Sequence, residues 1–188
     1  MVVLQQIHDS GLAPTNDLES ALWGVINPGA YTVILKGNNG GTGVGLVEVY
    51  DLDRTVDSEL ANISTRGFVD TGDNVMIGGL IVGGGTEGGT AQVMVRALGP
   101  SLPIAGALGD PTLELHDGSG TLVDSNDNWK TRPDGSSQQA EIEATTIPPA
   151  NDLESALVQT LPAGNYTVIV RGKDGTTGLG LVETYNLR

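Results

Sequence analysis

The sequence contains no cysteine, few aromatic residues and no long apolar run. Without cysteine, neither a disulfide framework nor thiolate chemistry is available, and this absence fits a cytoplasmic and an exterior location equally well. A membrane-spanning helix needs about 20 consecutive, mostly apolar residues, so we expect no membrane insertion. Residues 1–7 lack the basic start and the long apolar stretch of a signal peptide. If the protein is secreted, its signal has been removed or is absent from this chain.

Basic residues are also scarce. The chain has 9 lysines and arginines against 23 aspartates and glutamates, which gives a formal net charge of −14. Nucleic acids are bound through their phosphates by basic surfaces, so the charge excludes nucleic acid as a partner. It suits instead a well-hydrated acidic surface, and it is compatible with binding of a divalent cation.

What the sequence does contain is an internal repeat. Residues 12–53 align with residues 147–188 at a constant offset of 135 positions, and 23 of the 42 aligned residues are identical. The heptapeptide Asn-Asp-Leu-Glu-Ser-Ala-Leu occurs at residues 16–22 and again at residues 151–157. Self-similarity of this kind over this length identifies repeated structural units.

The two copies stand in unequal contexts. The second copy follows a long stretch of chain, whereas the first begins close to Met1. We therefore expect two domains. Residues 1–53 are predicted to be a half repeat, equivalent to the C-terminal half of a sandwich unit, and residues 54–188 are predicted to be one complete β-sandwich repeat unit.

Short segments rich in β-branched residues, bounded by Gly, Asn and Asp, predict strands throughout the chain. The predicted strands cover residues 2–7, 30–36, 44–50, 60–69, 74–82, 91–98, 112–116, 121–123 and 179–185, with a further strand around Tyr166. Hairpin turns are expected at residues 38–41, 83–89 and 117–120. Residues 17–25 favour a strand, although Asn16 and Glu19 also match a helix capping box.

Regularly spaced short strands without a long helical period predict an all-β fold. We expect an antiparallel, jelly-roll-like β-sandwich, with one complete unit preceded by a half unit. Strand alternation places a set of apolar side chains in the core. This set is Tyr166, Val168, Val170, Leu181 and either Val95 or Met94.

Several motifs carry a resemblance to a known family. They are Leu-Ala-Asn-Ile-Ser-Thr-Arg-Gly at residues 60–67, Arg-Ala-Leu-Gly-Pro-Ser-Leu at 96–102, Leu-Glu-Leu-His-Asp at 113–117 and Ser-Asn-Asp-Asn-Trp at 125–129, with the repeated heptapeptide. Together they resemble a repeat of large secreted bacterial proteins, and the second half resembles the bacterial pre-peptidase C-terminal domain. The resemblance implies a jelly-roll-like sandwich, an extracellular or cell-surface location, and a non-catalytic accessory role.

The acidic loop at residues 124–128 is the candidate metal site. It offers side-chain oxygens at alternate positions, as calcium loops do, but Trp129 stands where an EF-hand has glycine. The resemblance implies calcium near this loop, with the turn at Asp117 beside it. The predicted calcium ligands are Asp117, Asp124, Asn126, Asp127 and Asn128. The alternative interpretation is an Asx-rich turn that bonds its own backbone.

No convincing catalytic group emerges, so we expect a protein that is not an enzyme. Asp152 and Glu154 resemble a carboxylate pair, but they recur as Asp17 and Glu19 in the half repeat, which favours a structural role. The two histidines occupy non-equivalent positions. Trp129 is a candidate for stacking on a sugar, with a core role as the favoured alternative.

Two functions compete at this stage. The leading hypothesis is a non-enzymatic extracellular structural module that self-assembles into a fibre or surface polymer by strand pairing or swapping. The alternative is a calcium-dependent accessory module that binds carbohydrate or protein. The half repeat can fold against its own chain, pair with a neighbouring copy or belong to a longer array. We favour the neighbouring copy, because an unpaired half exposes sheet edges and an apolar face.

Overall fold

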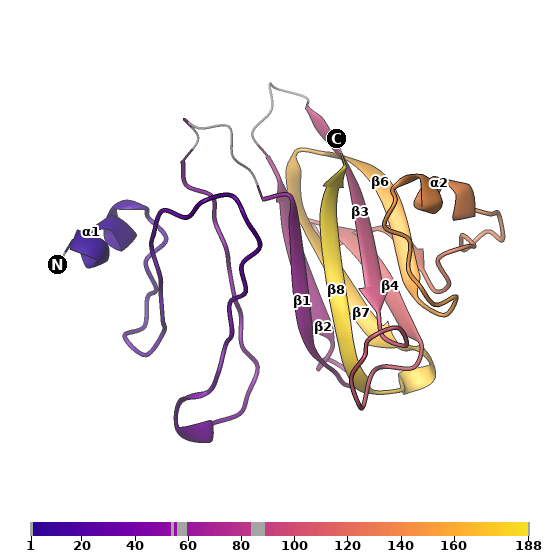
Figure 1. The fold of residues 1–188 in the computed structure, drawn as a ribbon, viewed down its shortest axis with the longest axis horizontal. Coiled ribbons are helices and arrows are strands. Elements are labelled where there is room, and N and C mark those ends of the chain that lie inside the picture. Colours follow the sequence, from indigo (N-terminus) through magenta and orange to yellow (C-terminus); the bar gives the residue numbers. More distant parts are fainter. Residues whose placement is uncertain (1, 54, 56–59, 84–88, 188) are drawn as a thin grey trace. The chain divides into compact units, whose positions relative to one another are not determined.

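The computed structural model describes residues 2–53, 55, 60–83 and 89–187. The chain divides into two compact units, Met1–Glu59 and Leu60–Arg188, which are considered separately below (Figure 1). None of the helices in the described part of the chain is long and apolar enough to cross a membrane.

The second unit is an antiparallel β-sandwich of eight strands, which confirms the predicted all-β fold class. The strands are β1 (Asn62–Val69), β2 (Met76–Val82), β3 (Thr90–Leu98), β4 (Pro111–Asp117), β5 (Leu122–Asn126), β6 (Ser155–Pro162), β7 (Gly164–Gly172) and β8 (Gly178–Leu187). One sheet has the order β1-β8-β3-β6 and the other β2-β7-β4-β5. A short helix, α2 (Gln139–Ala144), and the 3-10 turn η2 (Lys173–Gly175) complete the unit.

The strand pairing explains the jelly-roll order. The pairs β4·β5, β3·β6, β2·β7 and β1·β8 are all antiparallel. The chain therefore forms one long two-stranded ribbon, with its closed end at the β4–β5 turn, and the ribbon is rolled so that its strands fall alternately into two sheets. Two further contacts, β3·β8 and β4·β7, join neighbouring turns of the roll.

The repeated sequence forms one arm of this ribbon. We call residues 147–187, which contain β6, β7 and β8, the C-terminal copy, and residues 60–146 the receiving half. Strand β6 pairs with β3, β7 pairs with β2 and β4, and β8 pairs with β1 and β3. Every hydrogen-bonded neighbour of the C-terminal copy thus lies in the receiving half, and its own three strands do not pair with one another.

The main core lies between the two sheets. It includes Val95 of β3, Leu115 of β4, and Val168 and Val170 of β7, all fully buried, as predicted for β7. Tyr166 is also buried, as expected.

A second apolar cluster lies on the other face of β3 and β6. Met94, Ala156 and Val158 are packed there with Trp129 and with Ile142 of α2. Because consecutive strand residues point to opposite faces, Val95 enters the main core while Met94 enters the second cluster. Both of the alternatives proposed from the sequence are therefore buried.

Two local predictions for the second unit are wrong. Leu181 is only half-buried, and its neighbour Val182 occupies the core instead, because β8 alternates with the opposite phase. The expected hairpin at residues 83–89 does not form, since β2 and β3 belong to different sheets; residues 84–88 lie outside the described part. The strand favoured for residues 17–25 does form in the second copy, where β6 begins at Ser155 directly after a turn, but residues 17–25 themselves form no strand.

The first unit differs from expectation more strongly. Its described residues contain the helix α1 (Val2–Asp9) and the 3-10 turn η1 (Asn38–Gly40), but no strand. The strand predicted for residues 2–7 is thus a helix, and the hairpin predicted from 30–36 and 44–50 is absent. The reason is visible in the second unit, where the equivalent β7 and β8 lie in different sheets and take their backbone partners from the receiving half.

Candidate functional site

A buried carboxylate fastens the C-terminal copy to the receiving half. Glu154, at the start of β6, is fully buried. Its Oε1 accepts hydrogen bonds from the backbone N–H of Gly99 at 3.0 Å, from the N–H of Ser101 at 3.0 Å and from the Ser101 hydroxyl at 2.6 Å. Its Oε2 accepts the N–H of Asn151 at 3.1 Å. A carboxylate with four donors is well satisfied when buried, so Glu154 has a structural role.

This contact rules out a catalytic carboxylate pair. The side chain of Asp152 is 72% exposed and contacts Lys130, with 2.6 Å between Oδ1 and Nζ. Glu154, in contrast, lies inside the protein. The two residues occupy a turn and do not share the strand face that the sequence suggested. The glycine at position 99 is required at this point, because a Cβ there would lie 2.1 Å from the carbonyl oxygen of Leu108.

A second carboxylate of the C-terminal copy, that of Glu183, is bound by the same segment, residues 96–102, that contains Gly99 and Ser101. The Arg96 Nε of β3 lies 2.5 Å from the Glu183 Oε2 of β8, and both side chains are largely buried. The other oxygen of Glu183 accepts the hydroxyl of Ser64 at 2.6 Å. Arg96 also donates to the carbonyl of Ile147 at 2.6 Å and to the hydroxyl of Tyr185 at 3.0 Å. Burial, and then Glu183, raise the pKa of Tyr185 above its usual range.

Residues 96–102 therefore bind two carboxylates of the C-terminal copy. Arg96 contacts Glu183, while Gly99 and Ser101 contact Glu154. We call this set of contacts the polar junction. Removal of one partner of a buried ion pair costs about 3–5 kcal/mol, because the other charge stays buried without compensation. The polar junction thus favours one register between the two halves of the sandwich.

The N-terminal copy, residues 12–53, keeps the residues that make these contacts. Glu19 and Glu48 are equivalent to Glu154 and Glu183. Its apolar residues are exposed, however. Leu22 is 93% exposed where the equivalent Leu157 is 1% exposed, and Val33 is 58% exposed where Val168 is fully buried. In the described part of the first unit no strand covers these apolar side chains.

The predicted calcium ligands are distributed over different local contacts. Asp117 accepts bonds from Ser119 and Thr121 in its turn. Asp124 Oδ1 accepts the N–H of Ser125 at 2.8 Å, and Oδ2 accepts from Gln159 at 2.5 Å. Among the residues that the structure describes, no three His, Cys, Asp or Glu side chains gather as a metal site.

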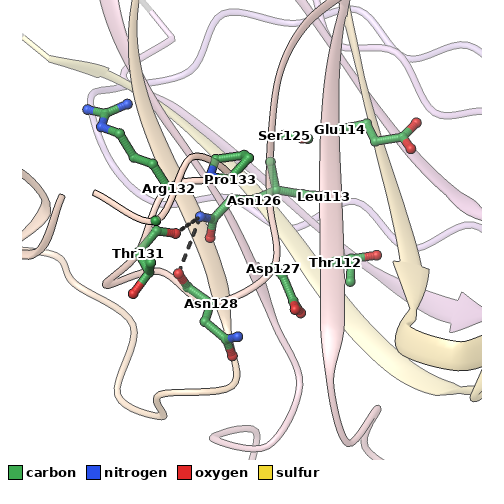
Figure 2. A pocket seen from close by; sticks show the side chains of 11 residues that line it. Thr112, Leu113, Glu114, Ser125, Asn126, Asp127, Asn128, Thr131, Arg132 and Pro133 are labelled. Carbon is green, nitrogen blue, oxygen red and sulfur yellow. Dashed lines mark hydrogen bonds between the residues drawn. The ribbon is translucent and has the colours of Figure 1, made fainter. Parts of the chain in front are cut away.

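The other three predicted ligands line a polar hollow of about 550 Å³ beside β4 and β5 (Figure 2). The amide nitrogen of Asn126 donates to the carbonyls of Asn128 at 3.3 Å and Thr131 at 2.9 Å, and its oxygen accepts the N–H of Ala156 at 3.1 Å. Asn126 is therefore used to fold the loop. The side chains of Asp127 and Asn128 take no part in this network, and they line the hollow together with residues such as Glu114 and Arg132.

Asp127 also belongs to a charged group at the base of η2. Its Oδ2 accepts from Lys173 Nζ at 2.7 Å, and Asp110 Oδ2 lies 3.8 Å from the same nitrogen. The remaining oxygen of each aspartate, Oδ1, is buried without a hydrogen-bond partner. Desolvation raises the pKa of Asp110. Lys173 supplies the positive charge here, at a position where a cation would otherwise be expected.

Two further candidates receive a structural explanation. Trp129 is buried, and its indole N–H donates to the carbonyl of Asn151 at 3.1 Å, so it is part of the second apolar cluster and is not available to stack on a sugar. His116 lies between Glu114 Oε2 at 3.0 Å and the carbonyl of Gly120 at 3.1 Å. The hydrogen bond with Glu114 is the main reason why the pKa of His116 is raised.

Sequence reasoning missed the polar junction. The identity of Glu154 with Glu19 suggested a structural role, but nothing in the sequence connected Glu154 with residues 99–101, which lie more than 50 positions away. One feature of the sequence could have indicated a bound carboxylate here. Arg96 is an isolated charge in a mostly apolar strand, and a Gly-Pro-Ser turn follows shortly after it. Such a turn offers free backbone N–H groups to an acceptor.

Comparisons with known proteins give limited information. No protein-family model matches the chain, and no curated protein matches its sequence. Among solved structures, the chain is similar to the pre-peptidase C-terminal domain of a collagenase from Bacillus anthracis, with 14% sequence identity and a TM-score of 0.40. The match covers 65% of this chain and 88% of that chain. The assignment to the jelly-roll class rests on the strand order described above.

Proposed function

We propose that the chain is a non-enzymatic structural module of an extracellular or cell-surface assembly, in which residues 12–53 join it to neighbouring subunits by strand pairing. One observation carries this proposal. The strands of the C-terminal copy pair only with the receiving half, so the N-terminal copy needs strands from outside residues 1–59. Exposed apolar side chains along an unpaired extended segment are the usual basis for strand addition and for polymerisation of subunits.

The engagement of the two most buried carboxylates in contacts between the two halves supports a structural role. Glu154 and Glu183, the most deeply buried carboxylates described, are engaged by donors of the receiving half. The negative charge of the chain favours a soluble surface around such an assembly. The extracellular location follows only from the motif resemblance and is part of the proposal.

The test compares the mass of the full chain with that of a variant lacking residues 1–53. We expect the full chain to form concentration-dependent assemblies in light scattering and ordered polymers in electron microscopy, and the shortened variant to be a folded monomer. A matched control is the double substitution Leu22→Asp and Val33→Asp in the full chain, which should reduce assembly without affecting the second unit. A compact full-length monomer at high concentration would disprove the assembly.

A second candidate function is calcium-dependent binding of a carbohydrate or protein in the polar hollow. The specific observation in its favour is that the Oδ1 atoms of Asp127, which lines the hollow, and of Asp110, which shares Lys173 with it, are buried without a hydrogen-bond partner. A hard cation that displaced the Lys173 ammonium would take such oxygens as ligands. Asp127 and Asn128 would contribute ligands, and the cation would order the loop for a ligand. Loss of glycan binding on chelation, with recovery on addition of calcium, would support this function.

A further inference from the structure

The N-terminal copy has the side chains that fit one kind of partner. Comparison of its residues with the equivalent residues of the C-terminal copy identifies this partner. In the second unit the receiving half buries Ala156, Leu157, Leu161, Tyr166, Val168, Val170 and Val182. The equivalent residues of the N-terminal copy are Ala21, Leu22, Ile26, Tyr31, Val33, Leu35 and Val47. Each is identical or a conservative aliphatic replacement, although none of these side chains is buried in the first unit.

The polar contacts point to the same partner. Glu19 is equivalent to Glu154, which accepts bonds from Gly99 and Ser101. Glu48 and Tyr50 are equivalent to Glu183 and Tyr185, which Arg96 contacts. Within the first unit the hydroxyl of Tyr50 donates to Glu48 at 3.0 Å, as Tyr185 does to Glu183 at 3.0 Å. The pair of Glu48 and Tyr50 is thus already arranged like Glu183 and Tyr185, and the equivalent of Arg96 would have to come from a receiving half.

Glycine positions provide an independent argument. A Cβ at Gly178 would lie 2.8 Å from the backbone of Leu108 in the receiving half, so only glycine fits there. The equivalent Gly43 has no atom within 4 Å of such a Cβ in the first unit. The first unit alone gives no reason for glycine at position 43. A partner that approaches as closely as the receiving half does would require it.

The number of arms, meaning copies of the three-strand segment that pairs with a receiving half, determines which partner would gain paired strands by binding the N-terminal copy. Residues 1–188 contain one receiving half and two copies of the arm that completes it, and the C-terminal copy already occupies that receiving half. Exchange of arms can link identical chains, as the proposed assembly requires, but it releases one arm for every arm that is bound. A receiving half without an arm of its own would in addition increase the number of paired strands, and it is therefore the more favourable partner.

We infer that residues 12–53 complete a jelly-roll sandwich with the first half of a repeat unit, a segment that resembles residues 60–146, carries an equivalent of Arg96 and the Gly-Pro-Ser turn, and lacks its own second half. This inference names the partner of the pairing in the proposed function. The N-terminal copy would replace residues 147–188 in the same register, with Tyr31 in the place of Tyr166. Trp23 would then stand where Val158 enters the second apolar cluster, so the partner has smaller side chains at that point.

A fusion protein tests this inference directly. A second copy of residues 60–146 is placed immediately before Leu12, in place of residues 1–11, so that the spacing equals that of the complete unit. We expect residues 12–53 to gain protection of their backbone amides from hydrogen exchange by about 100-fold or more, because fixed strand pairing replaces fluctuating structure. The second unit, residues 60–187 in the original numbering, serves as the internal folded reference.

Two controls keep the result interpretable. In the fusion, Glu19→Gln should lower the protection of residues 12–53, while Asp17→Asn, which removes the same charge from a position whose equivalent Asp152 forms only an exposed ion pair with Lys130, should lower it far less. A second fusion with Trp23→Val removes the predicted overpacking. If residues 12–53 stay unprotected in both fusions, the inference is overturned. If they are protected while the unmodified chain stays monomeric, the inference stands and self-assembly of this chain alone is excluded.

Discussion

The two copies of the repeat fold alike wherever the structure is local. In the N-terminal copy the hydroxyl of Tyr31 donates to the carbonyl of Asn27, four residues earlier, at 2.7 Å. In the C-terminal copy Tyr166 makes the same bond to Pro162 at 2.9 Å. The Asx turn is also shared, since Leu18 N–H donates to Asn16 at 2.9 Å and Leu153 N–H donates to Asn151 at 3.0 Å.

The turn after the central segment is equally preserved. Asn39 and Asp174 both adopt the left-handed region, with φ of 52° and 54°, and each is followed by a glycine, with φ of 74° at Gly40 and 75° at Gly175. These residue types tolerate that region, so the turn needs no support from outside.

The copies differ where a distant partner is needed. Residues 155–187 form three strands, and the equivalent residues of the first unit form none. Strands need neighbours for their backbone groups, and all neighbours of β6, β7 and β8 lie in residues 60–126. The comparison separates turn chemistry, which 42 residues can specify, from strand formation, which depends on the other half of the ribbon.

The largest effect should come from separating the two halves of the second unit. Residues 60–188 alone are expected to unfold in one cooperative transition, because every strand pair described for the unit lies within this segment. Residues 60–146 alone should show no cooperative transition, because β1, β2 and β3 lose their pairing partners. Thermal unfolding followed by circular dichroism checks both. A cooperative transition in residues 60–146 would show that the receiving half folds without the C-terminal copy, which would contradict this prediction.

The same substitution should lower the free energy of unfolding strongly in one copy and hardly at all in the other. Glu154→Ala leaves the buried N–H of Gly99 and the partly buried N–H of Ser101 without an acceptor, at about 1–3 kcal/mol for a buried unsatisfied group, and it also removes the packing of a fully buried side chain. We expect a loss of at least about 3 kcal/mol in the free energy of unfolding of the second unit. Glu19→Ala should change it by less than about 0.5 kcal/mol. Urea denaturation measures both, and equal losses would contradict the separation of the two copies.

A smaller effect is expected from calcium at the acidic loop. Because a ligand that binds only the folded state stabilises it, calcium at about tenfold above its Kd would add about 1.4 kcal/mol, and a chelator would remove this gain. Differential scanning calorimetry of the full chain measures the change. The control Asp127→Asn should abolish it, whereas Asp53→Asn, in the first unit, should not. Identical melting curves with calcium and with chelator would remove the metal from the protein's function.

The smallest predicted effect concerns pH. The pKa of His116 is raised above 6.5, first by its hydrogen bond with Glu114 and then by Gly120. Its stabilising contribution is therefore fully present below about pH 6.5 and is lost as the pH rises through the raised pKa. The ion pair is partly exposed, so we expect less than about 1 kcal/mol. His116→Gln should remove this part of the pH dependence from the melting temperature, and an unchanged profile would contradict the assignment.

Much of the second unit was predictable from local patterns. The β4–β5 hairpin, with Asp117 and Gly120 in its turn, and the alternation through Tyr166, Val168 and Val170 were correctly predicted, because period-two patterns and turn residues act over short distances. The wrong predictions concern partners. Segments adjacent in the chain were assumed to form hairpins, whereas the rolled ribbon sends β2 and β3, and likewise β7 and β8, to opposite sheets.

The sequence by itself determined the repeat, the turns of both copies and the all-β class, because identity, left-handed glycines and strand periodicity are properties of short stretches of chain. Only the tertiary structure decided which carboxylates are structural. Glu154 and Glu19 have the same local sequence, yet Glu154 is buried with four donors and Glu19 is exposed. The difference lies in residues 96–102, because three of the four donors to the Glu154 carboxylate come from the turn after β3, which is distant in the chain and is brought to Glu154 by the rolled ribbon.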